Sequence, residues 1–585
     1  MIFILLNLTV WQNIYIFNQR TRGTNVLLLN NDTIIISGGY GNNFPNTIVV
    51  KLDQLGNYID SRKTSDSRGG IIPGGYVINP ANEVVKISLE EFRSSYGEEA
   101  LEMAISPNPY FSIKENYLRV NNWPKRFTNF ESGKKDDELV EILIDYLKNG
   151  YRSKNIQIIE EIKSNLSIDD TRIYKTLGRK GYLKYNELPF FFIEEPISVN
   201  LEEDNYERVD LTNLYSFSVD DDETIEVDDA ISIDGNKIYI HVADVSSSLK
   251  ISKNLHLLER VISLYLPEKN FYFLPSDVIE KLSLHNGIKN SLTLLLEFDE
   301  NYKLKNYKFL RAKIKLKDRF NYKTFEKILL IEPFKKLLSI SRKFQLMRLN
   351  NGGYSYVLPL KKFKIEENGV KYELIDLNSK SYFVVSELMI LYNYIASKLL
   401  KKNDFPAVYR NYEEKTSINL NENDPLYYYK IMNAFKSTIL SSSPKPHCIL
   451  GLDVYAQFTS PLRRVYDIIN QEHLHRLLDN LQPIYSNEKI EEFIRIAVRV
   501  EKRKKFIQRN RLDFWTYVYI KENYKDKIIR GFVCRVNDKW SELFFPEFLI
   551  TEKVYYKGLD IGKKVNCLVK DVDPFGGKMD IFIVK

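Results

Sequence analysis

The stretch 219–231, V-DDDETIEVDD-A-I, gathers seven carboxylates among the ten residues Asp220–Asp229, in a chain whose formal net charge is +7. Two like charges about 4 Å apart repel by roughly 1–4 kcal/mol in water-like surroundings. Alternating apolar residues predict one strand leading in at 215–219 and another leading out at 231–233. The acids then lie on a loop and at a strand end, where a scaffold can aim them inward. Taken alone, the run fits a solvated acidic turn best.

Length and composition describe a multidomain soluble protein. The 585 residues are 44% hydrophobic and 28% charged, which is typical of globular chains with about three or four domains. The three cysteines form no CxxC pair, which argues against disulfides and structural zinc and favours a reducing compartment. The apolar opening, residues 1–17, is interrupted by Asn7, Gln12 and Asn13, so we expect one or two buried strands. Neither this nor any other segment reaches the length of about 20 apolar residues that spans a membrane.

The first two of four predicted domains differ in pattern. Residues 1–105 hold short β-like runs separated by Gly and Asn, without a phosphate-binding glycine pattern, and form a β-rich domain of unknown role. Residues 106–204 contain helical periodicity at 136–150, 156–166 and 168–177, followed by a possible hairpin at 178–192. Three helices and a hairpin favour a winged helix, and the alternative is a plain helical linker domain.

The other two predicted domains are 205–524 and 525–585. The first alternates strands (237–245 and 291–298) with helices (386–400 and 490–519). The second holds five β-like runs in about 60 residues, which suits an OB-fold barrel that binds single strands by stacking and charge. The predicted fold class is therefore α+β and multidomain.

The acidic run is first tested as a metal site. An EF-hand needs Gly at its sixth position and Glu at its twelfth, where this chain has Ile225 and Ile231. Oxygen ligands without His or Cys favour Mg²⁺ or Mn²⁺, and two such ions about 3.5–4 Å apart can clamp both oxygens of a phosphodiester displacement. Strand alternation predicts that Glu226 and Asp228 point to the same side and Asp229 to the opposite one.

A second stretch, 455–467, reads YAQFTSPLRRVYD. Arg463 and Arg464 follow a Ser-Pro pair, where a helix is expected to begin. A guanidinium group near a helix N-terminus suits a phosphate. On its own, this stretch fits an ordinary helix start with surface arginines.

Together the two stretches resemble the RNB family of exoribonucleases, which includes RNase II and RNase R. The shared pattern is D-x5-(acid)-x-D-D-A, followed over 200 residues later by Y-x-x-F-T-S-P-x-R-R-x-x-D. Between them, 241–245 (HVADV), Arg260 with 265–267 (YLP), 273–275 (FLP) and 386–396 (SELM, with Asn393 and Ala396) resemble further family elements in the same order. The resemblance covers about residues 210–520.

The resemblance implies an RNB-type α/β catalytic domain that hydrolyses single-stranded RNA processively from the 3′ end to nucleoside 5′-monophosphates, in RNA processing and decay. It assigns Mg²⁺, or Mn²⁺, to Asp220, Glu226, Asp228 and Asp229, and the scissile phosphate to Arg463. The RNA contacts that we expect are Tyr265, Tyr356, Arg260, Arg464 and Arg503. We further expect a monomer without a membrane partner, in the cytoplasm or inside an organelle such as a plastid.

Several positions depart from the family pattern. Glu226 stands where many members have Asp, and Gln457 where His is usual. Gln471-Glu472 replaces a common His-Arg, and Arg509 replaces a carboxylate upstream of Trp515. These departures keep a second hypothesis open, a catalytically silent RNA-binding or regulatory protein with the same fold. The retained carboxylates count against it, because a lost active site has no need of charges that repel one another.

Overall fold

The computed structural model describes residues 122–584 except 368, 414–420, 436–437 and 557, together with the backbone of eight strands within 1–86. The chain divides into two compact units, Met1–Thr128 and Asn129–Lys585. Each unit is taken by itself below.

The described backbone of the first unit forms eight strands. Four of them, β3 (Thr21–Asn30), β4 (Thr33–Tyr40), β5 (Asn46–Leu52) and β6 (Tyr58–Ser65), form an antiparallel sheet in chain order. Two further strand pairs flank this sheet in the sequence. Strand β1 (Phe3–Ile4) pairs with β2 (Tyr15–Ile16) before it, and β7 (Tyr76–Ile78) pairs with β8 (Val84–Lys86) after it. The β-rich pattern expected for this region is therefore present, while the predicted burial of residues 1–17 lies outside the described side chains.

The helical segment has the three helices that the periodicity predicts. They are α5 (Asp137–Asn149), α6 (Ile156–Leu166) and α7 (Asp170–Arg179), preceded by α4 (Trp123–Glu131), which spans the division between the units. The Asp136 side chain caps α5 by accepting a hydrogen bond from Leu139 N at 3.1 Å. Leu139 and Leu143 are buried on its inner face, as expected.

The predicted hairpin at 178–192 is wrong. Residues 180–193 form turns and a short 3-10 helix, Phe190–Phe192, and no strand occurs there. The physical reason lies in the aromatic run, because Phe190 packs edge-on against Tyr146 at 5.2 Å and Phe192 against Tyr174 at 5.9 Å. These rings anchor the segment to α5 and α7. The structure therefore has the helices of the winged-helix prediction without its hairpin.

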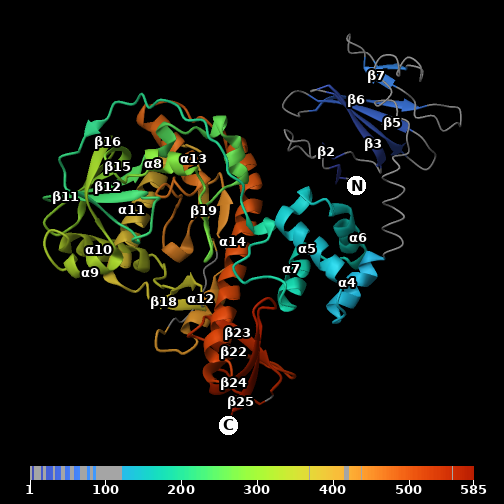
Figure 1. Cartoon of the computed structure of the whole chain (residues 1–585). Helices are drawn as coiled ribbons and strands as arrows, with labels where there is room; N and C mark the ends of the chain where they lie inside the picture. The colour runs from blue at the N-terminus through green and yellow to red at the C-terminus, as the bar shows by residue number, and fades with distance from the viewer. Residues whose placement is uncertain are drawn as a thin grey trace. The chain divides into compact units, whose positions relative to one another are not determined.

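A six-stranded sheet lies at the centre of the region 205–524 (Figure 1). Its order is β10 (Ser216–Val219), β11 (Asp229–Asp234), β12 (Lys237–Ala243), β15 (Ile288–Phe298), β16 (Leu304–Phe320) and β9 (Val209–Asp210). Because β10 also pairs in parallel with β16, the sheet curls round and closes on itself. One apolar core, which includes Phe217, Ile240 and Leu294, joins this sheet to the helices beside it.

The helices that cover this core include α9 (Tyr322–Ile328), α10 (Lys335–Asn350) and α11 (Lys380–Lys402). The prediction that no segment is apolar enough to span a membrane is wrong for α11, whose length and composition pass that test. However, 61% of its most apolar window is buried inside the protein, because Val384, Leu388 and Tyr392 belong to the core. The remaining elements here are α8 (Ser276–Leu282), α12 (Tyr427–Ala434), β13 (Leu264–Tyr265), β14 (Asn270–Phe271), β17 (Leu360–Glu366), β18 (Gly369–Ile375), β19 (Tyr409–Asn411) and β20 (Ile439–Ser441).

Two helices connect this sheet region to the C-terminal strands. Helix α13 (Val465–Leu478) starts beside the acidic loop, and α14 (Asn487–Tyr524), 38 residues long, runs down to the last five strands (Figure 1). These are β21 (Ile528–Val536), β22 (Ser541–Phe545), β23 (Ile550–Val554), β24 (Lys564–Asp573) and β25 (Lys578–Val584), antiparallel in the order β23-β22-β21-β24-β25. All five overlap the runs that the sequence predicts.

The helical segment contacts the C-terminal sheet through one aromatic ring. Phe575 packs edge-on against Tyr174 at 5.3 Å and against Phe514 at 5.0 Å. Its ring occupies the space beside Gly178, where a Cβ would lie only 2.2 Å from the ring. Arg179 adds an ion pair to Asp573 at 2.8 Å. Glycine at position 178 therefore allows these two parts to approach closely.

Candidate active site

The acidic stretch lies between two strands, as predicted. It leaves β10 at Asp220, whose N–H donates to the Phe320 carbonyl at 3.0 Å, and enters β11 at Asp229. The loop residues Asp221, Asp222 and Glu223 are exposed, whereas Glu226 and Asp228 are buried. The stretch is therefore divided into solvated loop charges and an inward-facing group of four, Asp220, Glu226, Asp228 and Asp229, which we call the acidic cluster.

Asp228 joins the acidic cluster to the second motif. Its Oδ1 accepts a hydrogen bond from Leu462 N at 2.9 Å, and its Oδ2 accepts one from Arg463 Nε at 3.1 Å. The Asp228 carboxylate is 3% exposed, and burial raises its pKa to about 7 although the Arg463 guanidinium lowers it. The predicted meeting of Asp228 and Arg463 across the sequence is thus present in the fold.

Glu226 is held by two hydroxyl groups. Ser263 Oγ donates to its Oε1 at 2.8 Å, and the Tyr265 hydroxyl donates to its Oε2. Burial nevertheless raises the pKa of Glu226, with the bonds from Tyr265 and Ser263 opposing the shift. The predicted alternation does not apply, because β11 begins only at Asp229 and residues 226–228 belong to the loop.

Asp220 and Asp229 have fewer partners than the other two acids. Asp220 Oδ2 is a buried atom without a hydrogen-bond partner. Burial raises the pKa of both groups, and for Asp229 the negative charges of Asp220 and Asp228 raise it further. Buried carboxylates that repel one another and lack donors are costly unless a cation compensates them.

The acidic cluster fits a divalent cation only in part. Its all-oxygen donor set suits Mg²⁺, and the unpartnered Asp220 oxygen beside Asp229 is where such an ion would find free ligands. Both oxygens of Glu226 and of Asp228 are already taken by protein donors. Within the described part of the chain, no three His, Cys, Asp or Glu side chains stand close enough together to hold a metal ion.

The other expected site residues fall into two groups. Arg464 is committed to Asp467 through two bonds of 2.9 Å, and Arg260 donates to the Tyr272 carbonyl at 2.7 and 3.0 Å. Both guanidinium groups therefore serve the fold. Arg503 is exposed and donates to the Phe191 carbonyl at 3.3 Å. Tyr356 stacks on Phe435 with ring centroids 4.8 Å apart.

Most of the departures from the family pattern are accommodated inside the protein. Gln471 Nε2 donates to the carbonyls of Ala243 at 3.0 Å and Phe458 at 3.2 Å. Glu472 accepts from Ile251 N at 2.9 Å, and burial raises its pKa to about 7. Gln457 leaves a buried Oε1 unpartnered, and Arg509 is mostly exposed.

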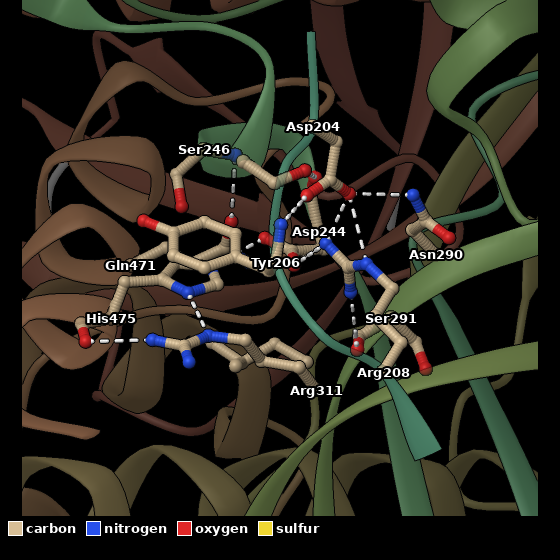
Figure 2. A network of polar contacts seen from close by, with 12 residues as sticks. Asp204, Tyr206, Arg208, Asp244, Ser246, Asn290, Ser291, Arg311, Gln471 and His475 are labelled. Atoms are coloured by element: carbon tan, nitrogen blue, oxygen red, sulfur yellow. Dashed lines mark hydrogen bonds and ion pairs between the residues drawn. The ribbon is translucent and has the colours of Figure 1, made fainter. Parts of the chain in front are cut away.

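Sequence reasoning missed a second buried carboxylate site, around Asp244 at the end of β12 (Figure 2). Arg208 donates to Asp244 Oδ2 at 2.6 Å and His475 Nε2 lies 2.7 Å from its Oδ1. Arg311 Nε donates to His475 Nδ1 at 2.8 Å, so both ring nitrogens of His475 are hydrogen-bonded. The ring of Tyr206 stacks on His475 at 4.5 Å. We call this group the Asp244 network; Asp204, also bound by Arg208, completes it.

Comparison with known proteins identifies the central domain. Residues 208–480 match the family model described as the RNB domain. An uncharacterized ribonuclease of Synechocystis sp. is 25% identical over 342 residues, which cover 55% of this chain and 51% of that protein. The mitochondrial exoribonuclease II of Schizosaccharomyces pombe is 25% identical over 443 residues, covering 63% and 46% respectively. The chain spans about half the length of the curated relatives it matches.

Solved structures show the same fold at low identity. The Dss1 exoribonuclease of Candida glabrata, an active-site mutant, matches with a TM-score of 0.61 and 19% identity over 86% of this chain and 73% of that one. Mycoplasma genitalium RNase R in complex with ribose-methylated single-stranded RNA matches at 0.56 and 18%, over 64% and 72%. Yeast Ssd1, a pseudonuclease, matches at 0.52 and 16%, over 70% and 58%. These structures show the same fold, and the match of residues 208–480 to the RNB domain model supports the resemblance read from the motifs.

Proposed function

We propose that this protein is a 3′→5′ exoribonuclease that degrades single-stranded RNA processively to nucleoside 5′-monophosphates, in RNA processing and decay. The observation that carries the proposal is the contact of Arg463 with Asp228, 235 residues apart in sequence. This contact places a guanidinium group, which is suited to bind phosphate, beside four carboxyl groups whose charge it cannot balance alone.

Arg463 is suited to hold the scissile phosphate. Its side chain is 45% exposed although its Nε reaches the buried Asp228, so the guanidinium has one edge on the cluster and another toward solvent. A planar guanidinium binds phosphate oxygens through two parallel hydrogen bonds. Arg463 then neutralises the charge that develops on the phosphate during displacement.

The acidic cluster is the proposed site for Mg²⁺, with Mn²⁺ as the alternative. Asp220 and Asp229 provide the free oxygens, and Glu226 and Asp228 complete the proposed ligand set of a two-metal site. A bound ion supplies Lewis-acid stabilisation and an activated water for the attack. The protein's own part is to hold these carboxylates in a buried loop, where a bound cation would favour their ionised forms.

The proposed RNA contacts are Tyr265, beside the acidic cluster, Tyr356 and the exposed Arg503. Arg260 and Arg464 support the binding surface by fixing their own segments. The four-domain layout remains a proposal, in which the five C-terminal strands act as an OB-fold that binds RNA. We also propose a monomer, located in a bacterial-type cytoplasm or inside an organelle.

A catalytically silent RNA-binding protein is the second candidate. It is favoured by the hydrogen bonds that occupy both oxygens of Glu226 and Asp228, and by the shared fold of the pseudonuclease Ssd1. It predicts RNA binding without metal-dependent turnover.

One experiment separates the two. A 5′-labelled single-stranded RNA is incubated with the protein and Mg²⁺, and with the Asp228→Asn variant. We expect the wild type to shorten the RNA and release mononucleotides, and Asp228→Asn to lose about 10²–10³-fold in rate, since it removes charge from the reacting centre. Glu223→Gln, on the exposed part of the same loop, is the matched control and should behave as wild type. RNA binding without any shortening by the wild type would establish the silent candidate.

A further inference from the structure

The segment Arg260–Phe273 contacts the acidic cluster without belonging to it. Both side chains that bind Glu226 come from this segment, namely Ser263 and Tyr265. Ser263 Oγ also accepts a hydrogen bond from Phe273 N at 2.8 Å, which ties the two ends of the segment together. We call residues 260–273 the brace, because the place of the Glu226 carboxylate depends on them.

The brace is also bonded to the backbone of the second motif. Ser263 N donates to the Arg463 carbonyl at 3.1 Å, and Val465 N donates to the Val261 carbonyl at 2.8 Å. Any movement of the brace therefore changes the position of Glu226 and of Arg463 together.

The brace contains a strained residue that needs support. Val261 has a φ of 61°, and a β-branched side chain is disfavoured in this left-handed region. Such a conformation costs of order 1–3 kcal/mol and persists only where surrounding contacts determine it. Val261 is fully buried, and its N–H and carbonyl are both hydrogen-bonded.

Helix α14 supplies that support next to Val261. The Lys504 ammonium donates to the Ile262 carbonyl and forms an ion pair with Glu194 at 2.6 Å. Its side chain is only 4% exposed, unlike those of its neighbours Lys502 and Lys505. A side chain so enclosed is not accessible to a nucleic-acid backbone.

A second contact with α14 holds the tip of the brace. Arg511 Nε donates to Glu268 Oε1 at 2.8 Å, and Trp515 Nε1 donates to the same oxygen. Arg511 also reaches the helical segment through the Tyr174 hydroxyl at 2.8 Å. The brace is thus fixed at its strained base by Lys504 and at its tip by Arg511.

We propose that Lys504 is a positioning residue for the acidic cluster. By holding the Ile262 carbonyl it keeps Ser263 and Tyr265 on Glu226, and so keeps Glu226 beside Asp228 and Arg463. The inference rests on the proposed function for its catalytic consequence, but its structural part does not. The inference gives Lys504 a different role from the solvent-facing basic residues of α14, which are suited to bind phosphates.

The test uses the full-length protein with Lys504→Met, which keeps the length of the side chain and removes its donor. Hydrogen–deuterium exchange is measured on peptides that cover 257–273 and 224–230. We expect exchange there to rise about tenfold, as for a lost charge-assisted hydrogen bond, with little change elsewhere. The matched control, Lys502→Met, removes one charge from the exposed face of the same helix and should leave exchange in these peptides unchanged.

Activity then gives a second, separate readout. Lys504→Met should lower the single-turnover rate about 10–100-fold, as supporting residues around such sites do, with the Kd for RNA within twofold of wild type. Lys502→Met should weaken RNA binding and its salt dependence and leave the single-turnover rate unchanged. The inference is overturned if exchange in 257–273 is unchanged in Lys504→Met, or if that variant weakens RNA binding with a normal rate.

The test remains decisive if Lys504→Met fails to fold or if the wild type has no nuclease activity. If Lys504→Met does not fold, Glu194→Gln loosens Lys504 without emptying its place and should raise exchange in the same peptides to a smaller extent. Unchanged exchange in that variant would also overturn the inference. If the wild type has no nuclease activity but exchange responds as described, the proposed function fails and the positioning role stands.

Discussion

The acidic cluster and the Asp244 network are both buried carboxylate sites at the ends of neighbouring strands, but their charge balance is opposite. Asp244 meets Arg208 at 2.6 Å and His475 Nε2 at 2.7 Å. The acidic cluster has four acids and Arg463 as the cation bonded to it. Burial alone would raise the pKa of Asp244, but its contacts with His475 and Arg208 hold it well below the usual range, whereas the pKa of Asp228 is raised to about 7.

The difference is the one expected between a structural site and the proposed metal site. The Asp244 network ties residues 204–208, strand β12 and helix α13 into one unit (Figure 2). The acidic cluster holds carboxylates that repel one another, and either protonation or the proposed cation would relieve that repulsion. The same substitution, Asp to Asn, should therefore have opposite effects on stability at the two sites.

The largest effect is expected for Asp244→Asn. The change removes the charge of one of the two carboxylates that pair with the buried Arg208, Asp204 being the other, and breaking a buried ion pair costs about 3–5 kcal/mol. Urea unfolding followed by circular dichroism measures the loss. Asp234→Asn, at the exposed end of β11, is the control and should lie within about 0.5 kcal/mol of wild type.

The pH dependence of that loss identifies its cause. A carboxyl group whose pKa is lower in the folded state stabilises the fold above its unfolded pKa, about 4, and this contribution disappears as pH falls through the folded value. The difference in unfolding free energy between wild type and Asp244→Asn should therefore be full at pH 7 and shrink below about pH 4. A difference that stays constant with pH would contradict the ion-pair explanation.

An intermediate effect is expected for Arg463→Met. Removing this cation leaves Asp228 and its neighbours without their counter-charge, which should cost about 1–3 kcal/mol in metal-free buffer because the guanidinium is half exposed. Mg²⁺ should recover part of the lost stability, and RNA shortening should stay absent. Thermal unfolding with and without Mg²⁺ measures both, and a variant as stable as wild type without metal would show that the cluster is neutralised in another way.

The smallest effect has the opposite sign. Asp229→Asn removes one of the repelling carboxylates, so in metal-free buffer it should raise the unfolding free energy by about 1–2 kcal/mol, on the scale of one pKa unit per 1.4 kcal/mol. Mg²⁺ should stabilise the wild type more than this variant. Destabilisation by Asp229→Asn without metal would mean that this carboxylate makes a needed structural contact.

The local sequence pattern predicted the helices and strands better than it predicted which residues they pack against. The periodicity of α5, α6 and α14 and the five C-terminal strands appear in the structure, because each depends on residues close in sequence. The hairpin at 178–192 failed because Phe190 and Phe192 are used for packing on helices. The apolar composition of α11 does not by itself distinguish a membrane span from a core helix. The fold shows that its residues form part of the core.

The residues of the candidate site could be predicted from the sequence only where they belong to a recognisable motif. The resemblance brought Asp228 and Arg463 together, although no local rule connects positions so far apart. The pairing of Arg464 with Asp467 follows the i, i+3 spacing of a helix and could have been found. The contact of Tyr265 with Glu226 and the role of Lys504 depend on tertiary packing, which periodicity does not record.

The close approach at Gly178 has a practical consequence for dividing the protein. A fragment that begins after residue 193 would uncover Phe575 and Phe514 and remove Tyr174 and Tyr185, the aromatic and hydrogen-bonding partners of Phe575 and Arg511. Such a fragment would expose adjoining rings to solvent and promote association between copies. The helical segment is best produced and studied joined to the domains that follow it.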